Sequence, residues 1–135
     1  MSEVGIGRVG VHLVCASLEM MGVSASIVEQ EGFDVVAVYK GQVLRIEVKA
    51  TSVAIGNVQR YSFMTAKGGK KRIISESDCD LVALVDNGGR RCYYMPAKDV
   101  IRMKTSLYNH HFKDEFLLFT NAVKKLNEED TNELG

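Results

Sequence analysis

Two runs of aliphatic and β-branched residues, separated by only three residues, constrain the fold of this chain most strongly. They occupy 33–39 and 43–51 and flank Lys40-Gly41-Gln42. Because β-branched residues favour strands and a short segment with glycine favours a tight turn, we predict a β-hairpin. Both strands are nearly continuous in apolar residues, as expected for strands that are covered on two faces. Such a hairpin requires a larger sheet and further elements that cover it.

Helical and strand-like patterns on both sides of this hairpin supply those elements. The predicted elements are, in order, a helix at 7–21 that stops at Gly22, a strand at 26–29, the hairpin, a strand at 59–65, a loop at 66–70, a second hairpin at 81–86 and 91–95 closed by Pro96, a short helix at 97–104 and a helix at 111–126. The last helix carries an apolar stripe of Phe112, Phe116, Phe119, Val123 and Leu126. This order predicts an α/β (α+β) fold with a small mixed sheet.

Length and composition limit the class of protein. The 135 residues suit one domain, expected at 1–126, followed by an acidic and frayed tail at 127–135. Apolar residues make up 46% and charged residues 25%, as in globular proteins. We find no apolar run long enough for a membrane span and no signal peptide. The three cysteines show no zinc-binding or disulfide pattern, which favours a cytoplasmic protein.

Charged residues interrupt both apolar runs at positions that the hairpin can bring together. A two-residue turn at 40–41 places Asp34 directly opposite Glu47, whereas a turn at 41–42 places Asp34 opposite Lys49. In both registers Asp34, Glu47 and Lys49 share one face, because side chains alternate along a strand. A three-residue turn would separate them, so this prediction depends on the length of the turn.

Two opposed carboxylates repel each other unless a cation lies between them. Mg²⁺ binds carboxylate oxygens, keeps several waters and favours sites that include a phosphate. A lysine on the same face can act on the attacking water and offset charge on phosphorus. These parts suit hydrolysis of a phosphodiester. An exposed cross-strand salt bridge is the simpler alternative, but the apolar setting of Asp34 and Glu47 favours a site.

A glycine-bearing first helix, Asp34, a hairpin, Glu47-Val48-Lys49 and Thr51-Ser52 together resemble the PD-(D/E)XK nuclease superfamily. The likeness covers residues 5–96, and small Holliday-junction resolvases and homing-type endonucleases are the most similar members. It implies a restriction-endonuclease-like core: a helix, three antiparallel strands, a further helix and a further strand, in a central mixed sheet flanked by helices. It also implies cleavage of DNA with Mg²⁺, for which Mn²⁺ can substitute.

The resemblance assigns roles to individual residues. It implies that Asp34, Glu47 and the backbone carbonyl of Val48 bind the metal, and that Asp34, Glu47 and Lys49 are catalytic, with Lys49 acting on the attacking water. Members often carry another glutamate on the first helix, and this chain has Val11 there. The substitution leaves a second hypothesis open: a nuclease-fold module with weak or no catalysis that binds nucleic acid or protein.

Basic residues are concentrated between Arg45 and Arg72, where seven Lys and Arg residues stand against one acid, although 17 basic and 17 acidic residues cancel overall. We therefore predict DNA as the partner, held through its phosphates by Arg45, Arg60, Lys67, Lys70, Lys71 and Arg72. A solubilising surface loop is the alternative. Because cutting two strands calls for two sites, we also expect a homodimer.

The segment Gly5-Ile6-Gly7-Arg8-Val9-Gly10 matches the glycine pattern of dinucleotide-binding proteins. That fingerprint requires a strand directly before it, and only four residues precede Gly5. We therefore expect no nucleotide cofactor. A close approach of the helix backbone to a neighbouring element explains the glycines better.

Overall fold

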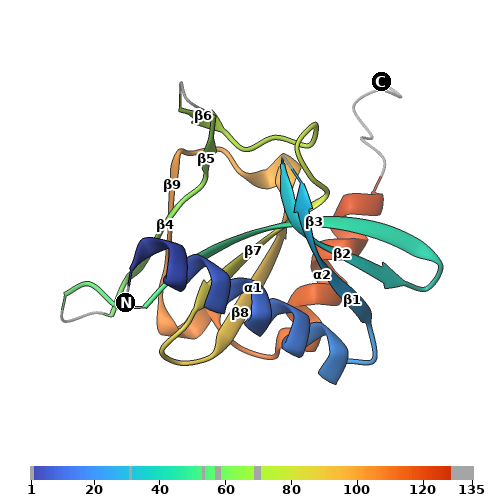
Figure 1. The fold of residues 1–135 in the computed structure, drawn as a ribbon, viewed down its shortest axis with the longest axis horizontal. Coiled ribbons are helices and arrows are strands. Elements are labelled where there is room, and N and C mark those ends of the chain that lie inside the picture. Colours follow the sequence, from blue (N-terminus) through green and yellow to red (C-terminus); the bar gives the residue numbers. More distant parts are fainter. Residues whose placement is uncertain (1, 31, 53, 57–58, 69–70, 129–135) are drawn as a thin grey trace.

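The computed structural model describes residues 2–30, 32–52, 54–56, 59–68 and 71–128. The elements are, in order, α1 (Glu3–Met20), β1 (Ser24–Gln30), β2 (Phe33–Tyr39), β3 (Gln42–Thr51), β4 (Tyr61–Met64), β5 (Ala66–Lys67), β6 (Arg72–Ile73), β7 (Leu81–Asp86), β8 (Arg91–Pro96), the 3₁₀ helix η1 (Ala97–Asp99), β9 (Lys104–Leu107), the 3₁₀ helix η2 (Asn109–His111) and α2 (Glu115–Asn127). The predicted α/β class is confirmed (Figure 1).

A five-stranded mixed sheet forms the centre of the fold, in the order β1-β2-β3-β7-β8. Strands β1, β2 and β3 are antiparallel, β7 runs parallel to β3, and β8 is antiparallel to β7. Both predicted hairpins are therefore confirmed. The parallel pairing of β3 with β7 makes the sheet mixed, as expected.

The turn between β2 and β3 has two residues, which decides between the two predicted registers. Lys40 and Gly41 have φ angles of 49° and 77°, the left-handed conformations that a tight primed turn requires. Tyr39 consequently pairs with Gln42, and the ladder continues to Val35 and Ile46. The next residues along the two strands, Asp34 and Glu47, therefore come to lie opposite each other.

Both α-helices pack against one face of the sheet. Val14 and Leu18 of α1 and Phe119 of α2 are completely buried in a cluster with alternate residues of the strands, among them Ile46. Gly10 permits the close contact of α1 with the sheet, because a Cβ atom there would lie 2.6 Å from the Cβ of Ala50. The expected close approach at the glycine segment is thus confirmed at this position.

Strands β4 and β9, and not a helix, cover the opposite face. They pair with each other and bury Tyr61, Phe63 and Leu107 against Val82 and Leu84 of β7. In Figure 1 they form, with β5 and β6, an arm at the upper left, away from the tip of the β2–β3 hairpin. The further helix that the resemblance implied between β3 and β7 is absent from the described residues of this segment.

Two predicted elements, the loop at 66–70 and the helix at 97–104, were wrong in part. Lys67 and Ala66 form the short strand β5 and not a loop, because they pair with β6. The expected helix at 97–104 is limited to η1, since Lys104 already begins β9, which pairs with β4. A strand that is completed by a partner 40 residues away gives no local pattern from which to predict it.

The first residue of each α-helix is determined by a capping side chain directly before it, Ser2 for α1 and Asp114 for α2. Helix α1 begins four residues earlier than predicted, because the Ser2 side chain accepts a hydrogen bond from the Gly5 N–H. Helix α2 begins at Glu115, capped by Asp114, so that Phe112 precedes it and packs under β4 instead. Phe116 is 49% exposed, so the predicted apolar stripe was wrong at its first two positions.

The C-terminal tail expected at 127–135 lies mostly outside the described residues, which end at 128. Within the described residues, neither helix has the length and the apolar character that crossing a membrane requires.

Candidate active site

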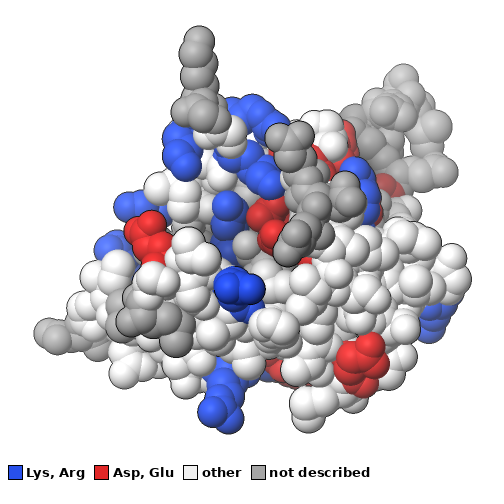
Figure 2. All heavy atoms as spheres, viewed as in Figure 1, with Lys and Arg blue, Asp and Glu red and all other residues white. Residues whose placement is uncertain are grey.

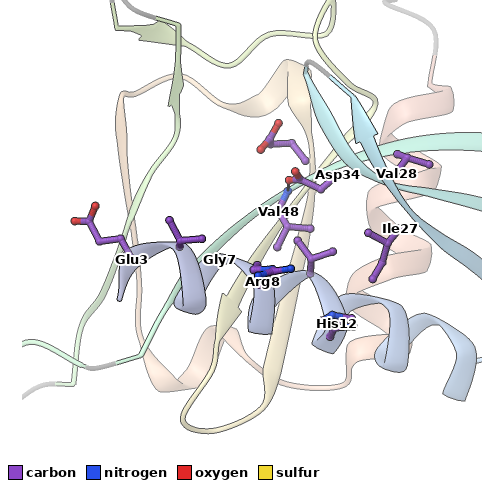
Figure 3. A pocket seen from close by; sticks show the side chains of 11 residues that line it. Glu3, Gly7, Arg8, His12, Ile27, Val28, Asp34 and Val48 are labelled. Atoms are coloured by element: carbon purple, nitrogen blue, oxygen red, sulfur yellow. Dashed lines mark hydrogen bonds between the residues drawn. The ribbon is translucent and has the colours of Figure 1, made fainter. Parts of the chain in front are cut away.

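A pocket of about 720 Å³ holds the two predicted carboxylates. It lies between the N-terminal half of α1 and residues of β1, β2 and β3, and Asp34, Glu47 and Val48 contribute to its sheet side. Figure 3 shows the Asp34 side chain on the side of the pocket opposite α1. The structure therefore brings together the two acids that the hairpin geometry predicted.

The Asp34 carboxylate is fixed by the backbone of the neighbouring strand. Its Oδ2 accepts a hydrogen bond of 2.9 Å from the Val48 N–H. A carboxylate that is held by a backbone donor keeps one orientation, and its second oxygen is left for another partner. Asp34 and the backbone of Val48 are thus neighbours, as the predicted ligand set requires.

Glu47 is the most unusual acid of the chain, because it lies in the middle of a strand with only 7% of its side chain exposed. Burial raises the pKa of its carboxyl to about 7. The hydrogen bond from Lys67 acts against this increase in pKa, and the nearby charge of Asp34 acts with it. Burial and Asp34 thus favour the protonated carboxyl group of Glu47, whereas positive charge beside it favours the carboxylate.

Lys49 lies two residues beyond Glu47 on the same face of β3, where it pairs with Leu84 of β7. The predicted sharing of a face is confirmed, but Lys49 does not line the pocket. Within the described part of the chain its side chain has no ion pair. The ammonium that does contact Glu47 is Lys67 of β5.

Helix α1 forms the other wall of the pocket and carries residues that the sequence analysis did not assign to it. Glu3, Arg8 and His12 line this wall, together with Val11. Val11, at the position where the resemblance implied another acid, thus borders the pocket that holds Asp34 and Glu47. The i, i+4 spacing of Arg8 and His12 could have indicated that they share a face, but no pattern placed that face beside the acids.

The six predicted DNA-binding residues differ in their surroundings. Three are ion-paired within the chain: Arg45 with Asp80, Lys67 with Glu47 and Arg72 with Asp78. Arg60 and Lys71 are exposed, with no ion pair among the described residues, and Lys70 lies outside those residues. Figure 2 shows Lys and Arg side chains over the arm that β4, β5, β6 and β9 form, with acidic side chains beside them.

The donor atoms around the pocket fit a hard cation such as Mg²⁺ only in part. Asp34 and Glu47 provide carboxylate oxygens beside the Val48 backbone, and Mg²⁺ commonly uses one or two carboxylates together with waters and phosphate oxygens. The described residues contain no group of three or more His, Cys, Asp or Glu side chains that could hold a metal. The arrangement therefore suits a cation that is bound jointly with a substrate phosphate.

Residues 6–115 match the PD-(D/E)XK endonuclease family. The chain belongs to this family. The assignment identifies it as a nuclease and places Asp34 and Glu47-Val48-Lys49 within the matched region. The predicted relationship is thereby confirmed.

A bacterial homing endonuclease, I-Ssp6803I, has a similar fold, with a TM-score of 0.71. The match covers 93% of this chain and 99% of the other, at 14% sequence identity. It confirms the restriction-endonuclease-like fold. No curated protein matches the chain.

Proposed function

We propose that this PD-(D/E)XK protein is a Mg²⁺-dependent endodeoxyribonuclease. The observation that carries the proposal is the pair of carboxylates on opposite strands, Asp34 and Glu47, which share an open pocket. Asp34, Glu47 and the Val48 carbonyl are the proposed ligands of Mg²⁺, for which Mn²⁺ can substitute. The chemistry that such an ion supplies is activation of water and stabilisation of charge on the phosphate.

In the proposed reaction the backbone orients the two carboxylates, and a lysine supplies positive charge. The Val48 N–H holds Asp34 in one orientation, and the sheet holds Glu47 opposite it. Lys49 is the proposed catalytic lysine, because its ammonium belongs to the same face and carries no ion pair among the described residues. It can hold the attacking water and offset the negative charge that develops on phosphorus.

DNA is the proposed substrate, and both linear and branched forms are candidates. Arg60 and Lys71 are exposed near β4 and β6 and are available for contacts with phosphates. A homodimer would supply one site for each strand. The three free cysteines suit a reducing compartment, so a cytoplasmic location belongs to the proposal.

Cleavage assays on supercoiled, linear and four-way-junction DNA test this proposal. We expect Mg²⁺-dependent cleavage by the wild type and a loss of at least about 100-fold in Glu47→Ala and Lys49→Ala. Glu76→Ala and Lys124→Ala, which alter exposed residues far from the pocket in sequence, serve as matched controls. Equal activity of the wild type and both site variants would contradict the assignment.

The apolar wall at Val11 favours one alternative function. With a single pair of acids, the fold can bind nucleic acid without cutting it. Calorimetry with Mn²⁺ and Mg²⁺ distinguishes the two: metal binding supports the nuclease, whereas salt-sensitive DNA binding without metal binding supports the binding module.

A further inference from the structure

A lysine from outside the β2–β3 hairpin occupies the position of a cation at the acid pair. Lys67 ends β5, and its ammonium donates a hydrogen bond to Oε2 of Glu47 and forms an ion pair with it. The two side chains are only 20% and 7% exposed. Both charges are therefore largely withdrawn from water, where each depends on its partner.

The groups around Glu47 explain why a cation is needed there. Asp34 lines the same pocket as Glu47, and its negative charge acts to raise the pKa of Glu47, because two like charges that are close together repel each other. Cys79, which is buried beside Glu47, has a pKa raised to about 12 by burial and is neutral. Lys67 is thus the group that supplies positive charge to the pair in the described structure.

Lys67 lies on a short strand outside the five-stranded sheet, so its ammonium can move away from Glu47 without a change in that sheet. Among the described residues, strand β5 pairs with β6 alone, through Ala66 with Ile73 and Lys67 with Arg72. Arg72 of β6 forms an ion pair with Asp78, and this contact does not involve Glu47. A lysine side chain is long and flexible, so rotation of its side-chain bonds suffices to withdraw the ammonium.

We infer that Lys67 is a resident counter-ion of the acid pair: it binds Glu47 in the metal-free protein and is released when a divalent cation binds. The inference rests on the proposed function, which supplies the metal. An ammonium and a divalent cation on the same carboxylate repel each other, so each excludes the other. Lys67 is therefore more accessible in the metal-loaded state than in the metal-free state.

A pulse of an amine-acetylating reagent, followed by mass spectrometry, reports the accessibility of Lys67 in the full chain. The probe cation is Ca²⁺, which also binds carboxylate oxygens. Because the Lys67 side chain is 20% exposed without metal, we expect its release to increase the rate of acetylation about fivefold. Lys124, on α2, is the internal control and should not respond.

Two variants make the experiment specific. Glu47→Gln removes the partner of Lys67, so Lys67 should be acetylated rapidly with and without Ca²⁺. Glu76→Gln, a change of the same kind at an exposed residue, should behave as the wild type does. The wild-type comparison stands by itself if Glu47→Gln does not fold.

The outcomes separate this inference from the proposed function. If calorimetry detects Ca²⁺ binding but Lys67 is acetylated at the same rate in both states, the inference is overturned and the metal site stands. If calorimetry detects no binding of Ca²⁺, Mg²⁺ or Mn²⁺, the proposed metal site fails, and the inference fails with it.

Discussion

The same substitution at two glycines of α1, three residues apart, should change stability in opposite directions. A Cβ atom at Gly10 would lie 2.6 Å from the Cβ of Ala50 in β3, a separation that real Cβ atoms do not show. A Cβ atom at Gly7 would meet nothing within 4 Å. Both positions are inside the helix, so alanine gains the same helix propensity at each, about 0.8–1 kcal/mol.

The difference between the two variants isolates the packing of α1 on the sheet. Forcing an extra methyl group into a packed contact costs about 1–3 kcal/mol. Gly7→Ala should therefore increase the free energy of unfolding by about 0.5–1 kcal/mol. Gly10→Ala should be less stable than Gly7→Ala by about 1–3 kcal/mol, because the gain in propensity cancels in the comparison.

Urea denaturation followed by circular dichroism measures both free energies. An unchanged slope with a shifted midpoint would show that the native state has changed in stability and that unfolding remains two-state. If Gly10→Ala is as stable as Gly7→Ala, α1 does not lie against β3 as described. The wall of the pocket that carries Arg8 and Val11 would then be placed incorrectly as well.

Three further predictions concern other contacts. The Arg72 guanidinium holds the pKa of Asp78 well below its usual range, so this contribution to stability is complete above about pH 5 and is lost as the pH falls below it. Thermal melts should show a steeper loss of stability between about pH 5 and pH 2 in the wild type than in Asp78→Asn. Parallel curves for the two proteins would contradict this prediction. Tyr94→Phe removes the buried hydrogen bond to Ser17 and should cost about 1–2 kcal/mol by urea denaturation, whereas a neutral result would exclude that bond. Lys71→Gln should reduce the salt dependence of DNA binding by about one unit of slope, while Lys124→Gln should not; equal slopes would remove Lys71 from the interface.

The sequence predicted the acid pair because the hairpin is a local structure. Strand alternation and the glycine at position 41 indicated that Asp34, Glu47 and Lys49 share one face. The exact length of the turn, which decides whether Glu47 or Lys49 lies opposite Asp34, was left open by the sequence and is given by the structure. Gly22, which ends α1 with a φ angle of 81°, was also predicted from the local sequence. Local rules sufficed for the shared face and for the end of the helix, but not for the register of the hairpin.

Contacts between distant segments could not be predicted in the same way. In the sequence, Lys67 stands beside glycines and was predicted to lie in a surface loop that contacts DNA. Its ion pair with Glu47 depends on the pairing of β5 with β6, which the local sequence does not indicate. Residues 97–104 were predicted to form a short helix, yet Val100 is buried with Tyr61, Phe63 and Leu107 on the face of the sheet that β4 and β9 cover, and Lys104 begins β9. In each case a tertiary contact decides the conformation against a weak local preference.

The central claim is that Asp34 and Glu47 bind one divalent cation between them. Anomalous X-ray scattering from crystals grown with Mn²⁺ tests it most directly. We predict the strongest peak between these two side chains, with carboxylate oxygens about 2.0–2.3 Å away and Lys67 withdrawn from Glu47. A map without a peak at that place, with Lys67 still bound to Glu47 at saturating Mn²⁺, would contradict the claim.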